Sequence, residues 1–231
     1  MTTLVTRFFD SRAHLESALA ERLARSMATS GAVAAHMLSG GTTPLPAYRA
    51  LALRPPPRNP QLHILFSDDR YVPEDSPASN YHQIAPLLAA LALPPAAVLR
   101  VRTALPLEEA ARDYERQLAG LLESGIRIGL GLLGLGADGH TASLFSASDI
   151  ARGSGRLAVA VQRPDGMSGV SVTPELLAQV AEPLFVVAGA DKCDAVRSLQ
   201  AQDSGLTAWR AVQRCARVEL WADRSAAPAV A

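Results

Sequence analysis

Net charge, long apolar runs and lysine are what this sequence of 231 residues has least of. It carries 22 Lys+Arg against 22 Asp+Glu, and this balance argues against a nucleic-acid surface or a polybasic membrane anchor. No uninterrupted apolar run reaches the roughly 18 residues of a membrane-spanning helix. The uncharged stretch 84–99, for example, is broken by three prolines. We therefore expect neither nucleic acid nor a membrane among the partners.

Cysteine is also scarce, and the features of a leader sequence are missing. Cys193 and Cys215 lack the spacing of a zinc site or a redox pair, which predicts two reduced thiols. The first residues, MTTLVTRFFDSR, reach charge too early for the apolar region of a signal peptide. A hydrophobic content of 48% is too high for intrinsic disorder. We expect a cytoplasmic globular protein with a single domain over residues 1–231 and a frayed tail at 224–231.

Short apolar strands alternate with helical segments along the chain. Residues 10–30 place Leu15, Leu19, Leu23 and Met27 on one helical face, and residues 107–122 form a second amphipathic helix. Further helices are predicted at 44–53, 79–91, 174–180 and 191–199, and strands at 2–9 (an edge strand), 31–38, 62–66, 98–101, 128–133, 157–161, 170–173, 184–187 and 218–221. This alternation predicts an α/β fold with a mainly parallel sheet and helices on both faces.

Four of these strands run into loops of unusual composition, and ligands of parallel α/β folds bind beyond the carboxyl ends of the strands. The first loop consists of Ser39, Gly40, Gly41, Thr42 and Thr43 and leads into a helix. Its backbone N–H groups, its hydroxyls and the helix dipole together favour an anion. It lacks the lysine of a P-loop and the spacing of a dinucleotide fingerprint, so a nucleotide is not indicated. A tight turn with a helix cap is the simpler alternative.

The second and fourth loops each offer a cation. Asp68, Asp69 and Arg70 follow an apolar strand, where Arg70 could neutralise a carboxylate or bind a substrate phosphate. Lys192 is the single lysine beside 21 arginines, and it follows a strand at the start of a helix, a position that suits a phosphate-binding ammonium group. A solvated turn and a surface lysine, respectively, are the simpler alternatives.

The third loop, GLGADGHTAS at 134–143, is the most informative. Its glycines present Asp138 and His140 two residues apart, which are the components of an oriented general base at neutral pH. A purely structural histidine is the alternative. A metal site built from Asp68, Asp69, Asp138 and His140 would lack a recurring ligand pattern, and Ser143 lacks the Gly-x-Ser-x-Gly turn of a nucleophile. We therefore expect no metal and no serine nucleophile.

These segments, in this order, resemble the 6-phosphogluconolactonases, a branch of the glucosamine-6-phosphate isomerase/deaminase superfamily. The resemblance runs from about residue 4 to residue 221, and its specific parts are LSGGTTP (38–44), FSDDRYVP (66–73) with SNY (79–81), LGLGADGHTASLF (133–145), SVTP (171–174) and GADK (189–192). It implies a modified doubly wound α/β fold, no cofactor, and hydrolysis of 6-phospho-D-glucono-1,5-lactone to 6-phosphogluconate in the oxidative pentose phosphate pathway.

The resemblance also implies roles for individual residues. His140 would activate water for attack on the lactone carbonyl, with Asp138 and Asp68 in the catalytic centre. The phosphate and ring of the substrate would be held by the 39–43 loop together with Arg70, Asn80 and Lys192. The expected partner is a small sugar-phosphate lactone, and the expected state is a monomer or a weak homo-oligomer.

The sequence departs from its relatives before the SVTP segment. Relatives carry a phosphate-binding arginine at the position of Gly169 in this chain. Arg163 in the preceding loop is a candidate replacement, so it joins the predicted substrate-binding residues. The reach of Arg163 decides how firmly the chain holds a phosphate.

Two other functions stay open. A deaminase of the same superfamily would carry a glutamate five residues after the motif histidine and commonly a tyrosine after the acidic pair. This chain has Phe145 and Arg70 at those positions, and both favour the lactonase. A catalytically silent sugar-phosphate sensor would need the anion loop but no base, so the presence of Asp68, Asp138 and His140 together argues against it.

Overall fold

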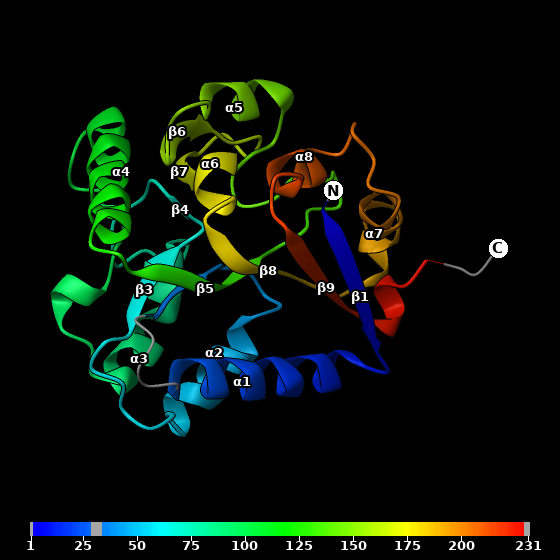
Figure 1. Cartoon of the computed structure of the whole chain (residues 1–231), viewed down its shortest axis with the longest axis horizontal. Helices are drawn as coiled ribbons and strands as arrows, with labels where there is room; N and C mark the ends of the chain where they lie inside the picture. The colour runs from blue at the N-terminus through cyan, green and yellow to red at the C-terminus, as the bar shows by residue number, and fades with distance from the viewer. Residues whose placement is uncertain (1, 29–33, 229–231) are drawn as a thin grey trace.

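A parallel sheet of six strands forms the centre of the molecule (Figure 1). The computed structural model describes residues 2–28 and 34–228. In spatial order the strands are β1 (Thr3–Phe9), β9 (Arg217–Asp223), β8 (Val180–Val187), β5 (Arg127–Leu133), β2 (Ala34–Leu38) and β3 (His63–Phe66), and each neighbouring pair runs parallel. The predicted α/β fold with a mainly parallel sheet is confirmed, and β1 is an edge strand as expected.

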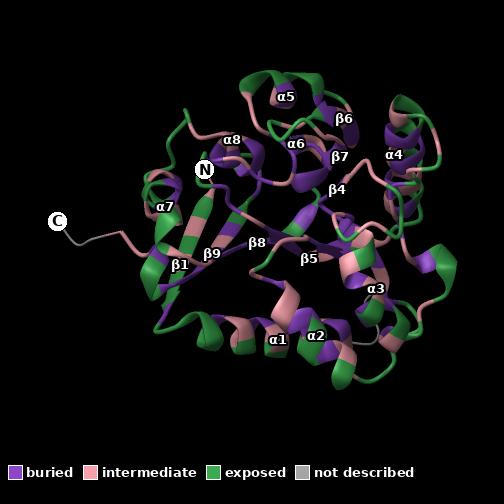
Figure 2. Ribbon diagram, turned by 180° about the vertical axis from the view of Figure 1, so that it is seen from behind, coloured by how far each residue is buried: buried purple, intermediate pink, exposed green. Residues whose placement is uncertain are grey.

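Helices cover both faces of this sheet. One face packs against α1 (Arg12–Ala28), α2 (Leu45–Leu53) and α3 (Asn80–Leu91), and the other against α4 (Leu107–Glu123), α6 (Pro174–Leu177), α7 (Cys193–Gln200) and α8 (Thr207–Val212). Side chains of β8 alternate between the two cores: Phe185 and Val187 belong to one, Leu184 and Val186 to the other. Both faces of the central strands are therefore buried over most of their length, as Figure 2 shows for β5 and β8, and their sequences are continuously apolar over 128–133 and 183–187.

The amphipathic patterns explain the two long helices. In α1 the residues Leu15, Leu19, Leu23 and Met27 are all fully buried, as their four-residue spacing predicts. In α4 the apolar stripe faces the opposite core, and Glu108 and Glu109 occupy the first turn, where the helix dipole favours negative charge.

A second, smaller sheet lies beside the first. Its strands are β4 (Asp68–Arg70), β7 (Ser168–Val172) and β6 (Ala158–Gln162), and both pairs are antiparallel. The sequence pattern predicts strands at the positions of β6 and β7 but does not assign them to a separate sheet, and it predicts a loop at 68–70, where the structure has β4. The connection 163–167 is too short for a parallel crossover, so these strands form a hairpin.

Several boundaries also differ from the predictions. Residues 98–101 form a single bridge, between Val98 and Ile64, instead of a strand. The predicted helix 174–180 ends at Leu177 because the chain turns into β8 at Val180. The helices α5 (Ala147–Arg152) and α8 were not predicted, since six residues are too few to show a helical stripe. Short 3₁₀ turns occupy Pro95–Ala97 and Ala190–Lys192.

The C-terminal segment differs from the prediction in its first residues. The predicted frayed tail is wrong at its start: Arg224–Ala226 form a 3₁₀ turn, the Asp223 side chain accepts a hydrogen bond from the Ala226 N–H, and Ala226 is buried. The last two residues of the predicted helix 10–30, the first three of the predicted strand 31–38, and 229–231 of the tail lie outside the described residues.

The loops that follow β2, β3, β5 and β8 gather at one edge of the molecule. These four strands are neighbours in the parallel sheet, in the order β8-β5-β2-β3, and the registers align Leu38 with Phe66 and Leu133 with Phe185 at their carboxyl ends. The four loops therefore meet, as the sequence predicts. Among the helices of residues 2–28 and 34–228, none is long and apolar enough to cross a membrane.

Candidate active site

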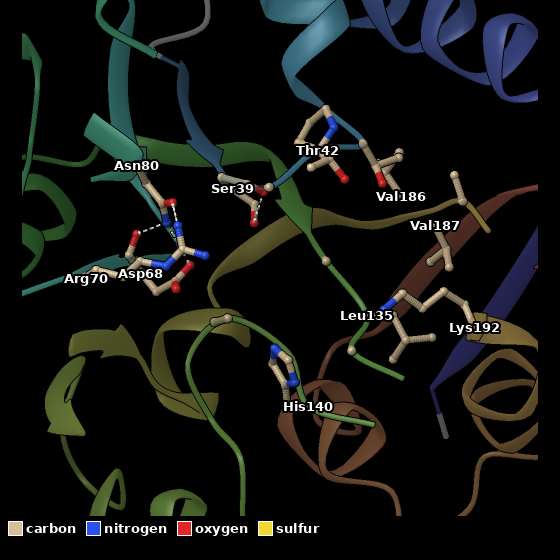
Figure 3. Close-up of a pocket in the computed structure, with 18 of the residues that line it drawn as sticks. Ser39, Thr42, Asp68, Arg70, Asn80, Leu135, His140, Val186, Val187 and Lys192 are labelled. Atoms are coloured by element: carbon tan, nitrogen blue, oxygen red, sulfur yellow. Dashed lines mark hydrogen bonds between the residues drawn. The ribbon is translucent and has the colours of Figure 1, made fainter. Parts of the chain in front are cut away.

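A cavity of about 220 Å³ opens beyond the carboxyl ends of the parallel strands (Figure 3). Its lining includes nearly every predicted site residue, namely Ser39, Gly40, Gly41, Thr42, Thr43, Asp68, Arg70, Asn80, His140, Arg163 and Lys192. Asp138 is the predicted site residue that does not line it; it lies beside His140 with a half-exposed side chain. In Figure 3, Arg70 and Lys192 lie on opposite sides of the view, and His140 lies below and between them.

His140 and Asp138 form a hydrogen-bonded pair in the loop after β5. The Nδ1 atom of His140 lies 2.5 Å from Oδ1 of Asp138. Gly136 runs directly against this pair: a Cβ atom there would lie 2.1 Å from Nδ1 of His140. Gly139 adopts a φ of +82°, in the left-handed region that favours glycine. Two of the motif glycines are therefore needed to seat the imidazole on its carboxylate.

The electrostatics of the pair suit a base. Partial burial raises the pKa of Asp138, but the hydrogen bond and charge of His140 outweigh that effect and leave the pKa below its ordinary value. Asp138 is therefore an anion at neutral pH and accepts the Nδ1–H of His140. In that tautomer Nε2 carries the free lone pair. Nε2 has no hydrogen-bond partner among the described residues.

Phe145 supports the imidazole from the far end of the same loop. Its ring centre lies 4.5 Å from that of His140, and the guanidinium carbon of Arg163 lies 5.2 Å from the Phe145 ring centre. A deaminase of the superfamily would carry a glutamate at this position. In this chain an apolar ring lies there and contacts two cavity residues.

Asp68 is a buried carboxylate of the cavity wall, and its described hydrogen-bond partners are all donors. Its Oδ1 accepts from Oγ of Ser67 at 2.8 Å and from Nδ2 of Asn80 at 3.4 Å. Its Oδ2 accepts from Oγ of Ser143 at 2.7 Å. Donors on both of its carboxylate oxygens therefore hold Asp68 in place in the cavity wall.

The adjacent Asp69 has a different environment. Its Oδ1 accepts from the backbone N–H groups of Arg70 and Asn80 at 2.8 and 2.7 Å, and its Oδ2 from that of Tyr81 at 3.1 Å. Two of these N–H groups belong to the first turn of α3, which has no other partner for them. Burial raises the pKa of Asp69 to about 6; the backbone hydrogen bonds oppose this, and the charge of Asp68 adds to it. Asp69 therefore builds the wall and does not line the cavity.

Asn80 ties this wall together, as the dashed lines in Figure 3 show. Its Oδ1 accepts from Nη1 of Arg70 at 2.7 Å, and its Nδ2 donates to the backbone oxygen of Asp68 at 2.8 Å. Nη1 of Arg70 also donates to the Ala78 carbonyl. Gly40 of the first loop rests on this amide, because a Cβ atom at Gly40 would lie only 1.9 Å from Oδ1 of Asn80. The glycine allows the loop and α3 to approach closely.

The 39–43 loop lines the cavity and leaves backbone N–H groups unpartnered within the described part of the chain. None of the backbone N–H groups of residues 40–43 donates a hydrogen bond to another described residue. The loop is fixed by its carbonyls instead, with Arg12 donating to Thr42 at 2.7 Å and the Tyr48 hydroxyl to Ser39 at 2.9 Å. Because α2 begins directly afterwards, the site has the charge distribution of an anion cradle.

Lys192 lines the cavity from the 3₁₀ turn between β8 and α7. Its Nζ lies 3.1 Å from the carboxylate of Asp191, whose side chain is 66% exposed. Such an exposed ion pair neutralises little of the ammonium charge. The structure therefore places the single lysine of the chain at the cavity and not on the outer surface.

Arg163 reaches the cavity from the turn between β6 and β7. Its Nη1 donates to Oγ of Ser143 at 2.8 Å, while Nε and Nη2 donate to Asp165 at 3.1 and 3.0 Å. Gly169 lies alongside, and a Cβ atom there would be 3.4 Å from Cδ of Arg163. The side chain of Arg163 therefore packs directly beside the position that has no side chain. The reach of Arg163, which the sequence left open, extends to the cavity wall.

Two residues of the site were missed or misjudged. Ser143, weighed from the sequence only as a nucleophile, is fully buried and connects Asp68 to Arg163. Asp165 was not singled out, and its spacing of two from Arg163 was the available signal. Within residues 2–28 and 34–228, no group of three or more His, Cys, Asp or Glu side chains is arranged to hold a metal ion.

Comparison with known proteins places the chain in a family. The sequence pattern of the glucosamine-6-phosphate isomerases/6-phosphogluconolactonase family matches residues 10–221. The chain belongs to this family. A 6-phosphogluconolactonase of Thermotoga maritima is 37% identical over 160 residues, which are 68% of this chain and 70% of the relative. One of Synechocystis is 37% identical over 174 residues, which are 72% and 71% of the two chains.

The fold of this family is also the fold of the structure. The crystal structure of the Thermotoga maritima 6-phosphogluconolactonase matches with a TM-score of 0.78 at 26% identity, over 97% of this chain and 100% of that one. The predicted family, and with it the predicted class of lactonase enzymes, is confirmed. The family name joins two chemistries, isomerases and lactonases, and the relatives named above are lactonases.

Proposed function

We propose that this protein hydrolyses 6-phospho-D-glucono-1,5-lactone to 6-phosphogluconate, the second step of the oxidative pentose phosphate pathway. The observation that carries the proposal is the His140–Asp138 pair, joined at 2.5 Å, on a cavity that also contains Lys192 and an anion-binding loop. Such a cavity combines a base with a grip for a phosphate. Relatives named 6-phosphogluconolactonase, at 37% identity, support the same reaction.

The substrate is held at its phosphate. The unpartnered N–H groups of residues 40–43, the dipole of α2 and the ammonium group of Lys192 bind the phosphate, and Arg70 and Asn80 contact the ring. Binding at the phosphate positions the lactone carbonyl beside the base and its water, and this positioning contributes to the rate.

His140 acts as the base. Its Nε2 takes a proton from a water molecule while the oxygen of that water attacks C1 of the lactone, and Asp138 stabilises the imidazolium ion that forms. When the bond between C1 and the ring oxygen breaks, the imidazolium ion returns the proton to that oxygen. A positioned base of this kind contributes about 10²- to 10⁴-fold to the rate. Asp68, held by hydrogen bonds from Ser67 and Ser143, orients water or a sugar hydroxyl.

Deamination of an amino-sugar phosphate is the second candidate, because the family includes isomerases. That chemistry needs an acidic group near the motif histidine to open the ring and move a carbon-bound proton. Phe145 occupies that place, and its ring centre lies 4.5 Å from that of His140. A ring-closed lactone needs neither step, so the apolar neighbour favours lactone hydrolysis.

The decisive test follows the decay of freshly generated 6-phosphogluconolactone with and without protein, corrected for spontaneous hydrolysis. A parallel sample contains glucosamine 6-phosphate with a readout for ammonia. Accelerated decay without ammonia supports the lactonase, and ammonia release would assign the chain to the deaminases. Binding of 6-phosphogluconate without turnover of either compound would favour a silent sensor.

We further propose a cytoplasmic location and a monomer or weak homo-oligomer. Two free thiols, Cys193 and the buried Cys215, agree with a reducing compartment. Localisation of a tagged copy in cells and sedimentation of the purified protein test these two statements.

A further inference from the structure

The cavity carries positive charge at two ends, and a single phosphate accounts for one of them. Lys192 lies on one side of the view in Figure 3 and Arg70 on the other, and Arg163 also lines the cavity. Arg70 pairs with Gly169 across the small sheet, next to the space that Arg163 fills. The pKa of Asp165 is lowered first by its hydrogen bonds with Arg163 and further by the charge of Arg70, so the two guanidinium groups share one side.

We propose that Arg163 faces the C1 end of the lactone, where it stabilises the negative charge that develops on the carbonyl oxygen and then contacts the carboxylate of the product. This inference rests on the lactonase function proposed above. It differs from the expectation that Arg163 replaces a phosphate-binding arginine missing at Gly169.

The position of Arg163 relative to the base supports this assignment. The imidazole of His140 and the guanidinium group of Arg163 both contact the ring of Phe145, with distances of 4.5 and 5.2 Å to its centre. The carbon atom that water attacks must lie close to the base. A cation held against the same ring as the base is therefore at the reacting end of the substrate.

Buried carboxylates at this end argue against a phosphate there. Nη1 of Arg163 lies 3.9 Å from Oδ2 of Asp68, and both side chains are at most 10% exposed. Asp69 adds a second buried carboxyl group nearby. These carboxyl groups disfavour a phosphate dianion more strongly than the single negative charge of the transition state or of the product carboxylate, which one guanidinium group can offset. At the other end the carboxylate beside Lys192 is the exposed Asp191.

Arg163 is also fixed in advance, as an oxyanion-binding group needs to be. Asp165 holds Nε and Nη2, and the buried hydroxyl of Ser143 holds Nη1 and separates the guanidinium group from Asp68. A guanidinium group has five N–H donors, so two remain for a ligand. Donors oriented before the reaction stabilise developing charge without a cost of reorganisation.

The electron flow of the step is complete. As the water oxygen bonds to C1, the π electrons of the carbonyl move to its oxygen. Arg163 stabilises the negative charge on that oxygen, and His140 holds the proton taken from the water. The carbonyl bond re-forms as the bond from C1 to the ring oxygen breaks, and that oxygen takes the proton from His140. The acid formed at C1 then ionises to a carboxylate, so product binding reports on the same contact.

A pair of ligands separates the two ends of the cavity. Glucitol 6-phosphate has the phosphate of 6-phosphogluconate but an alcohol in place of the C1 carboxylate. Calorimetry measures the Kd of both compounds for the wild type, Arg163→Gln and Lys192→Ala. Arg156→Gln is the matched control, because this arginine precedes β6 and pairs with Glu115 away from the cavity.

We expect the wild type to bind 6-phosphogluconate at least about tenfold more tightly than glucitol 6-phosphate, as for a charge-assisted hydrogen bond. Arg163→Gln removes this preference and keeps the affinity for glucitol 6-phosphate, whereas Lys192→Ala weakens both ligands. In turnover of the lactone, Arg163→Gln lowers kcat about 10²-fold with little change in KM, and Arg163→Lys recovers part of the loss.

Equal weakening of both ligands by Arg163→Gln would overturn the assignment and make Arg163 a phosphate ligand. Unchanged affinities and an unchanged kcat would also overturn it. A wild-type protein that binds neither compound and does not turn over the lactone would reject the lactonase function itself, and the role of Arg163 with it. A wild type that is active but shows no preference for the carboxylate would reject the role of Arg163 alone.

Discussion

Replacing Gly40 with alanine tests how closely the anion loop and the cavity wall are fitted together. The added Cβ atom would lie 1.9 Å from Oδ1 of Asn80 and 2.3 Å from its Cγ. Asn80 is 1% exposed, and its amide is bonded to both Arg70 and Asp68. The amide must move by at least about 1 Å to relieve the overlap, and such a movement breaks both hydrogen bonds.

The magnitude follows from these contacts. Forcing extra volume into a packed site costs about 1 to 3 kcal/mol, and the two lost hydrogen bonds, one of them to a charged group, add about 1 to 3 kcal/mol. We expect a loss of about 2 to 6 kcal/mol in the free energy of unfolding. For a chain of this size, that is a fall of about 4 to 24 °C in Tm.

The assay is thermal and urea unfolding of Gly40→Ala beside two reference variants. Gly134→Ala is the matched control, since Gly134 lines the same cavity but a Cβ atom there meets nothing within 4 Å. In the double variant Gly40→Ala/Asn80→Ala the clash partner is absent, so the second substitution should add little to the loss from Asn80→Ala alone. A wild-type Tm for Gly40→Ala, or strictly additive losses, would refute the reasoning.

Three further predictions concern other parts of the molecule. His140→Ala should fold normally, still bind 6-phosphogluconate in calorimetry and lose about 10²- to 10⁴-fold in kcat; near-wild-type turnover would remove His140 from the mechanism. The pKa of Asp69 is raised from 3.8 to about 6, so the folded state retains a proton that the unfolded state releases in this window. Wild-type stability should therefore fall as pH rises from about 4 to about 6, by up to about 3 kcal/mol from this group, and Asp69→Asn should lack this decline; parallel stability curves against pH would contradict it. A Cβ atom at Gly120 in α4 would meet no atom within 4 Å, so Gly120→Ala should raise the free energy of unfolding in urea by about 1 kcal/mol. A loss of stability would contradict this.

The sequence predicted those parts of the fold whose signal is periodic. The stripe from Leu15 to Met27 and the continuous apolar runs of β5 and β8 gave the helices and the parallel sheet, because burial on one or two faces leaves a pattern in composition. The strands β6 (AVAVQ) and β7 (SGVSV) are short and contain buried apolar residues, as the parallel strands do. Their separate sheet depends on the short turn between the strands and on their pairing with β4, which composition does not record.

The candidate site was predicted to a similar extent and for a related reason. Strand order brings the four loops to one edge, so residues next to strand ends could be found from the sequence. Adjacent residues with opposite surroundings could not be separated in this way. Asp68 lines the cavity while Asp69 holds the start of α3, and only the three-dimensional contacts distinguish them.

The location of Arg163 on a hairpin has a consequence for the evolution of such sites. His140 and Lys192 follow strands of the parallel sheet, whose order involves the whole chain, whereas Arg163 sits in a turn between two neighbouring strands. The register of a hairpin is set locally by its turn. A change of turn length can therefore transfer an arginine from strand to turn and leave the base and the lysine undisturbed. Under the role proposed for Arg163, exchange of the turn 163–167 between relatives would change recognition at the C1 end of the ligand.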